Sequence, residues 1–191
     1  MKLIGKALAA VLLLGCAQAA QAAPLFFRAD LLGVNEVPPT GSPGTGTANV
    51  MIDPFTNQLK VDIIFNGLEA NASASHIHCC TAPGTNTGVS VGFPGFPAST
   101  TGTYSHTFDL TQASIYTSAF LTASGGTAAL AEDALIAGIE AGKGYVNIHD
   151  SIFPGGEIRG FLVSVPEPVT LSLFGAGLAG VAALRRRRKK S

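Results

Sequence analysis

The middle of the chain alternates between hydrophobic and polar residues with a period of two. In residues 59–65 the odd-numbered positions are Leu, Val, Ile and Phe, whereas Lys60 and Asp62 lie between them. Because neighbouring side chains of a strand point to opposite faces, this run predicts a strand with one buried face. Similar short runs recur between segments rich in Gly, Pro, Ser and Thr, and they predict eight strands, over residues 25–32, 47–52, 58–65, 73–78, 89–93, 103–108, 144–149 and 157–163. The pattern is typical of an all-β sandwich or barrel.

One segment departs from this period. Residues 127–143 are rich in Ala and Leu, with apolar positions near helical spacing, and Gly142 and Gly144 follow. We therefore predict one short amphipathic helix before the last hairpin. Residues 81–101 contain many Gly and Pro and predict a long irregular excursion with at most one strand.

The two ends are typical of targeting signals. Residues 1–23 combine a basic start, a short apolar run and an Ala-rich stretch with A-x-A sites, which predicts a secretory signal peptide. The alternative is a lipobox that would acylate Cys16. Residues 165–191 contain Pro166, Glu167 and Pro168, an apolar run over 169–184 and six basic residues, an arrangement that favours a membrane anchor with a cytoplasmic tail. Residues 24–164 remain as the folded domain.

The net charge of zero hides an acidic domain. Between residues 24 and 165 lie four basic and 11 acidic residues, a balance of about −7. Phosphate contacts need Lys and Arg, so this composition excludes nucleic-acid binding.

His76 and His78 are the sharpest chemical feature. Residues i and i+2 of a strand share a face, so both imidazoles can converge on one ion, and nitrogen ligands suit copper or zinc. The alternative is a structural role, in which these rings hydrogen-bond carboxylates such as those of Asp150 or Glu157. We interpret His106 as a half-exposed strand residue rather than a ligand.

Cys79 and Cys80 follow directly and would be the only cysteines left after signal-peptide removal. In an exported protein they favour a disulfide or a metal site over free thiols. Three arrangements are open: a vicinal disulfide, two thiolates on a soft metal, or a bond to a second chain.

The C-terminal arrangement closely resembles the PEP-CTERM sorting signal of Gram-negative bacteria. In that family an exosortase recognises the Pro-Glu-Pro motif, and the following helix and basic tail are removed. The resemblance implies an exported envelope, surface or matrix protein, with exosortase and signal peptidase as its processing partners. Membrane contact through residues 169–184 would then be transient.

Four ordered motifs resemble the CHRD domain, first noticed in chordin: Leu-Leu-Gly-Val-Asn-Glu-Val-Pro-Pro from residue 31, Ser-His-Ile-His from 75, Gly-Tyr-Val-Asn-Ile-His from 144 and Pro-Gly-Gly-Glu-Ile-Arg-Gly from 154. The resemblance covers roughly residues 25–163. It implies a Greek-key β-barrel or sandwich of about eight strands, either distantly similar to copper-zinc superoxide dismutase or immunoglobulin-like, and no established enzymatic activity.

These motifs also suggest a polar cluster. A hairpin at 150–156 would bring His149 near Glu157 and Arg159, which share a strand face. If the first and last strands pair near the His pair, the result is either a metal site or a buried ion-pair network.

We therefore expect a non-enzymatic exported protein whose β domain has an unassigned binding role. The alternative is a copper- or zinc-binding protein, and a dismutase-like redox activity is one version of this alternative. The further ligands of the dismutases, including a bridging histidine, have no motif-level counterpart here. A polysaccharide-binding module is a third hypothesis, weakened by the absence of Trp and the presence of only three Tyr.

Overall fold

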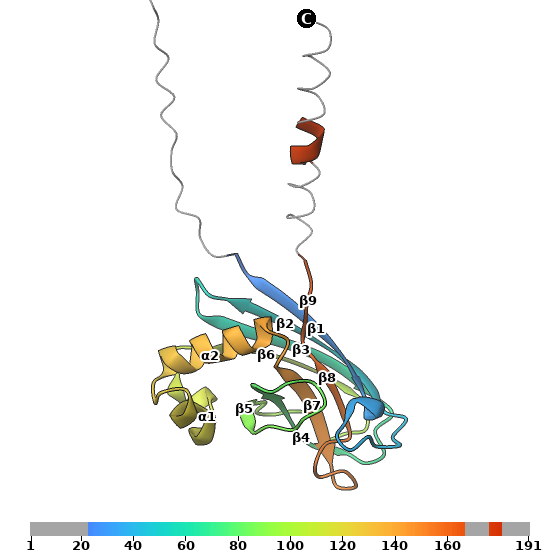
Figure 1. The fold of residues 1–191 in the computed structure, drawn as a ribbon. Helices are drawn as coiled ribbons and strands as arrows, with labels where there is room; N and C mark the ends of the chain where they lie inside the picture. Colours follow the sequence, from blue (N-terminus) through green and yellow to red (C-terminus); the bar gives the residue numbers. More distant parts are fainter. Residues whose placement is uncertain (1–22, 167–175, 181–191) are drawn as a thin grey trace, which may run out of the picture.

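The computed structural model describes residues 23–166 and 176–180. Within them, the strands form one antiparallel sheet: β1 (Leu25–Leu32), β2 (Thr45–Asp53), β3 (Gln58–Asn66), β4 (Ala72–His78), β5 (Val89–Gly92), β6 (Gly102–Asp109), β7 (Tyr145–Asp150), β8 (Ile158–Phe161) and β9 (Val163–Ser164). Their order is β5-β4-β7-β8-β1-β2-β3-β6, and β9 also pairs with β1. The sheet curls into a half-barrel (Figure 1), which confirms the predicted all-β barrel or sandwich class.

The alternating pattern places one face of each strand in the core. Phe27, Ala29 and Leu31 of β1 are buried, and the four apolar residues at odd positions of β3 are buried beside them. This burial supplies the main driving force for the fold, about 25 cal/mol for each Å² of apolar surface removed from water.

Two helices lie beside the sheet (Figure 1), where one was expected. The predicted helix is α2 (Ala128–Glu140), whose N-cap residue Thr127 accepts a hydrogen bond from Leu130 N at 3.3 Å. Its residues Leu135 and Ile139 pack into the core. The additional helix α1 (Ser118–Ala123) spans six residues, too few for a helical period to stand out in the sequence.

The last predicted strand is divided into β8 and β9. Leu162 is buried, and its amide donates to the carbonyl of Gly144 at 2.9 Å, so the chain leaves β7 at this point and continues along β1 alone. Two single-turn 3₁₀ helices, η1 (Gly33–Asn35) and η2 (Ala113–Ile115), complete the elements of residues 23–166. The predicted irregular excursion is confirmed and contains only β5.

Both ends of the described domain leave from the same end of the sheet (Figure 1), because Ser164 of β9 lies opposite Phe27 of β1. The predicted signal peptide lies almost entirely outside the described residues. Of the predicted apolar span 169–184, only residues 176–180 are described, and they are helical. Among the described residues, no helix is long and apolar enough to cross a membrane.

Candidate metal centre

Three imidazoles meet where β4 pairs with β7. His76 and His78 lie on the same face of β4, whereas Ile77 between them is buried in the core. In the antiparallel register Ala74 lies opposite His149 and His76 lies opposite Asn147, so His149 comes beside His76. One ring nitrogen from each of the three histidines lies within 4.8 Å of the others. His76 Nδ1 and His149 Nε2 are 3.2 Å apart.

In two of the three rings, the Nδ1 atom donates a hydrogen bond to a backbone carbonyl. His78 Nδ1 donates to Thr87 O at 2.7 Å, and His149 Nδ1 donates to Pro154 O at 3.0 Å. Each donation leaves Nε2 as the nitrogen with the free lone pair. For His78 this atom is buried and has no hydrogen-bond partner among the described residues. His149 Nε2 also lies 2.9 Å from the side-chain amide of Asn147.

Burial keeps the cluster uncharged. Burial, together with the neighbouring His149 and His78 rings, lowers the pKa of His76 to about 4. Burial also lowers the pKa of His78 and of His149. Because neutral imidazole is the form that binds a metal ion, the rings are in a ligating state at neutral pH.

A second layer of contacts fixes the orientation of His78. Its ring stacks on Tyr145 with centroids 4.7 Å apart and planes 2° apart. The Tyr145 hydroxyl accepts from Thr87 N at 3.3 Å, and the guanidinium of Arg159 lies over the Tyr145 ring at 4.8 Å. Arg159 Nη1 also donates to Asn86 Oδ1 at 2.7 Å. Arg159 therefore secures the loop whose Thr87 carbonyl orients His78.

The structure separates the two members of the expected Glu157–Arg159 network. Both side chains are buried, but the ion pair of Arg159 is with Glu36, at 3.7 Å between Nε and Oε2. Glu157 instead accepts hydrogen bonds from the Ser42 hydroxyl and from Glu69 N. Among the described residues Arg159 makes its ion pair with Glu36, directly after η1, and not with the expected Glu157, a contact between residues far apart in sequence.

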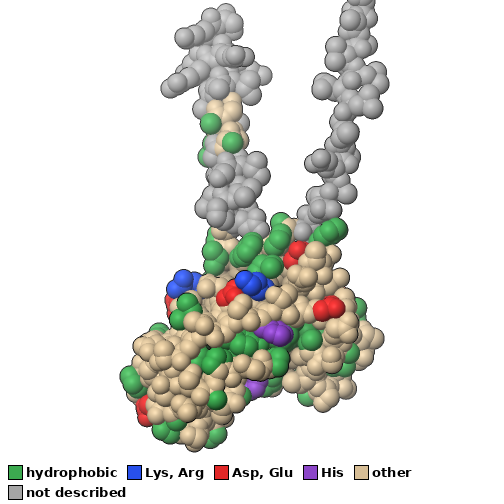
Figure 2. All heavy atoms as spheres, turned by 180° about the vertical axis from the view of Figure 1, so that it is seen from behind, with side chains coloured by type: hydrophobic (Ala, Val, Ile, Leu, Met, Phe, Trp, Pro, Cys, Tyr) green, Lys and Arg blue, Asp and Glu red, His purple; other side chains and the backbone are tan. Residues whose placement is uncertain are grey.

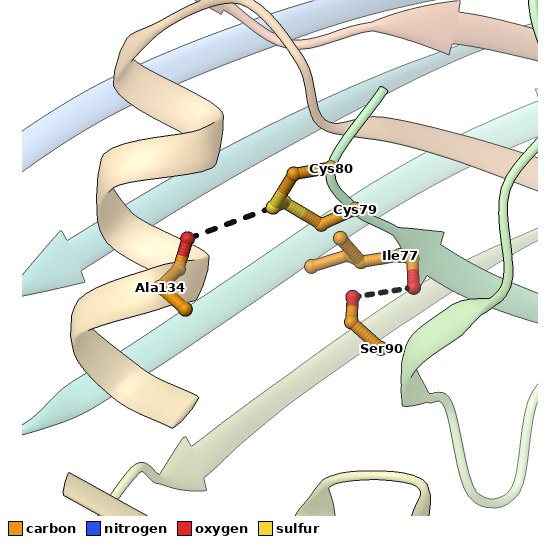
Figure 3. The surroundings of a disulfide bond; sticks show 5 residues. All are labelled: Ile77, Cys79, Cys80, Ser90 and Ala134. Carbon is orange, nitrogen blue, oxygen red and sulfur yellow. Dashed lines mark hydrogen bonds between the residues drawn. A yellow bond between two sulfur atoms is a disulfide. The ribbon is translucent and has the colours of Figure 1, made fainter. Parts of the chain in front are cut away.

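Cys79 and Cys80 form a disulfide with each other, so the vicinal arrangement is the one that the structure contains. Their sulfur atoms do not belong to the histidine group and lie against α2, beside Ala134 (Figure 3). A β-carbon at Gly138 of that helix would overlap both sulfurs. The pair is therefore a contact between the end of β4 and α2, and it offers no thiolate to the three imidazoles.

The remaining predicted residues lie apart from the centre. His106 lies on strand β6, as predicted, and is exposed rather than half-exposed. Pro166 is exposed directly after Val165, whose amide donates to Phe26 O at 2.8 Å. The other two residues of the sorting motif, Glu167 and Pro168, lie outside the described residues.

Sequence reasoning did not identify the supporting residues. Tyr145 and Asn147 share a strand face with His149, so period-two alternation was a usable signal for them. For Glu36, Asn86 and Thr87 no local pattern indicates a role, because their contacts come from loops distant in sequence.

Comparison with known families gives two matches. Residues 27–162 match the CHRD domain, and residues 164–188 match the PEP-CTERM protein-sorting motif. Comparisons with curated proteins and with solved structures found no match. The sorting motif indicates a bacterial protein that is exported and sorted by an exosortase to the cell surface or the extracellular space. Since the first match covers most of the chain, the protein belongs to the CHRD domain family.

Proposed function

We propose that this is a non-enzymatic surface or matrix protein of a Gram-negative bacterium whose β domain binds one copper or zinc ion through His76, His78 and His149. The observation that carries the proposal is the buried Nε2 of His78, which has no hydrogen-bond partner among the described residues and belongs to a group of three convergent nitrogens. Leaving such an atom unpaired is costly, and a metal ion would satisfy it.

The surroundings of the rings support metal binding over a purely structural role. In metal sites a ligating histidine usually donates its other ring nitrogen to a carbonyl or carboxylate, which fixes the tautomer. His78 and His149 both make this contact, with Thr87 and Pro154. A structural role would require hydrogen-bond partners for the Nε2 atoms too, and His78 Nε2 has none among the described residues.

The donor set limits the chemistry. Nitrogen ligands suit both copper and zinc, with metal–nitrogen distances of about 2.0–2.1 Å for zinc. Three imidazoles would leave a fourth position for water or another small ligand. The Cys79–Cys80 disulfide removes the thiolates that would favour a soft-metal site.

The test is the metal content of the protein purified from the cell envelope, measured by elemental analysis. We expect near-stoichiometric copper or zinc in the wild type and its loss in His78→Gln and in the double variant His76→Ala/His78→Ala. The matched control is His106→Ala, because His106 is an exposed histidine outside the group. Metal-free wild type whose melting temperature does not respond to either ion would overturn the proposal. Equal metal loss in the His106 control would also overturn it.

A further inference from the structure

A cleft lies where the sheet does not close. β5 and β6 are the two ends of the strand order. Beside them is a cleft of about 630 Å³, lined by residues of β4, by the segment that follows β5, by β6 and by the segment before α1. A volume of this size matches small-molecule sites, which measure about 300–1,000 Å³.

Aromatic side chains form much of the cleft. Phe93 contacts Tyr104, with ring centroids 5.4 Å apart, and Phe96 stacks on Phe65 at 5.2 Å. On β6, His106 lies between Tyr104 and Phe108, and its ring centroid is 4.4 Å from that of Phe108. Figure 2 shows histidine side chains beside a band of hydrophobic side chains on one face of the molecule. The wall therefore offers ring faces and edges to which another flat ring can stack.

The polar groups that line the cleft are hydroxyls and imidazoles. Ser114 and Thr117 line it together with His76 and His106, and its lining includes no Lys, Arg, Asp or Glu. A charged ligand would lose part of its hydration there without gaining an ion pair to Lys, Arg, Asp or Glu, which is costly. An uncharged ligand with a hydroxyl group has partners for both its ring and its polar atom.

A buried hydroxyl beside the cleft also has no partner. Tyr104 is 7% exposed, and its Oη makes no hydrogen bond among the described residues. Its ring contacts Phe93 and Phe96, both of which line the cleft. This hydroxyl belongs to a ring that packs against two residues of the cleft wall, and Tyr104 itself is not part of the lining.

We propose that this cleft, between the β4–β5 edge and β6, binds a small uncharged aromatic molecule that carries a hydroxyl group. The ring packs against Phe93 and Phe96 and the hydroxyl pairs with His106 or a neighbouring hydroxyl. The inference does not depend on the proposed metal, because His106, Phe93 and Phe96 lie outside the three-histidine group. His76 borders both sites, so it is left unchanged in the test.

The experiment is a fluorescence titration of the full-length protein, without added metal, using 2-naphthol as the probe. The comparison probe is 2-naphthalenesulfonate, which has the same ring system with a charge. We expect saturable binding of 2-naphthol that is about tenfold or more tighter than that of the sulfonate. We expect His106→Ala and Phe96→Ala each to weaken it about fivefold, the scale of one aromatic contact.

A control variant separates the possible results. Phe55→Ala removes a 62% exposed aromatic ring that is not part of the cleft and is expected to leave the affinity unchanged. If Phe96→Ala does not fold, the exposed His106 decides the outcome. Absence of saturable binding, equal affinity for the sulfonate, or unchanged affinity in His106→Ala would overturn the proposal.

Discussion

At the scale of single residues, Gly138 shows how packing can reverse an intrinsic preference. Ala is a better helix former than Gly by about 1 kcal/mol, so Gly138→Ala would stabilise an exposed helix. Here the added β-carbon would overlap the sulfurs of Cys79 and Cys80. Overpacking of this kind costs about 1–3 kcal/mol, and we therefore expect the substitution to destabilise the protein.

Urea unfolding under non-reducing conditions checks this prediction. The matched control is Gly41→Ala, because a β-carbon at Gly41 would have no atom within 4 Å. A lower midpoint in Gly138→Ala alone supports the packing argument. Equal midpoints in the two variants would contradict it.

At the scale of elements, η1 and β8 are joined by a buried ion pair between Glu36 and Arg159 whose charged atoms are not in hydrogen-bonding contact. Glu36 follows η1 and faces Arg159 of β8 at 3.7 Å, but the Nε hydrogen of Arg159 goes to Asn35 O instead. Burial therefore outweighs the attraction of Arg159 and raises the pKa of Glu36 from 4.5 to about 7. The carboxyl holds its proton more tightly in the folded protein than in the unfolded chain.

This raised pKa predicts a pH dependence of stability. The contribution of Glu36 to folding is fully present below pH 4.5 and is lost as the pH rises through about 7. Glu36→Gln mimics the protonated form, so we expect its free energy of unfolding to increase relative to the wild type over this range. Urea titrations at a series of pH values measure the difference, and a difference that is constant or shrinks with rising pH would contradict the assignment.

At the scale of the whole molecule, the described domain begins and ends at one end of the sheet. β9 pairs with β1 through Val163 and Ser164, and Val165 N donates to Phe26 O. Pro166 of the sorting motif follows directly. The signal therefore starts at the folded domain with no intervening linker, and the last strand is short and exposed.

Truncation measures what this strand contributes. A chain that ends at Leu162 loses the backbone hydrogen bonds of β9, each of which contributes about 0.5–1.5 kcal/mol. We expect it to unfold at a lower temperature than a chain that ends at Pro166. The double substitution Val163→Ser/Val165→Ser in the longer chain is the control, since both side chains are exposed and only the backbone pairing is kept. Equal melting temperatures for the two truncations would show that β9 adds no stability.

The sequence alone determined what depends on local patterns. Period-two alternation placed the strands within a few residues, and helical spacing identified α2. The same alternation put His76 and His78 on one face, because that relation involves neighbours in a single strand. The sorting signal was also readable, since its order of motif, apolar run and basic tail is linear.

Tertiary structure decided every relation between distant segments. The register of β4 against β7 brings His149 to the His pair, and η1 supplies Glu36 to Arg159 in place of the expected Glu157. The cleft lies beside β5 and β6, the two end strands of the sheet, which do not pair with each other. The His76–His149 contact joins residues 73 positions apart, and the Glu36–Arg159 pair joins residues 123 positions apart. Local spacing carries no information about them, because register and loop packing are set by the burial of the whole core.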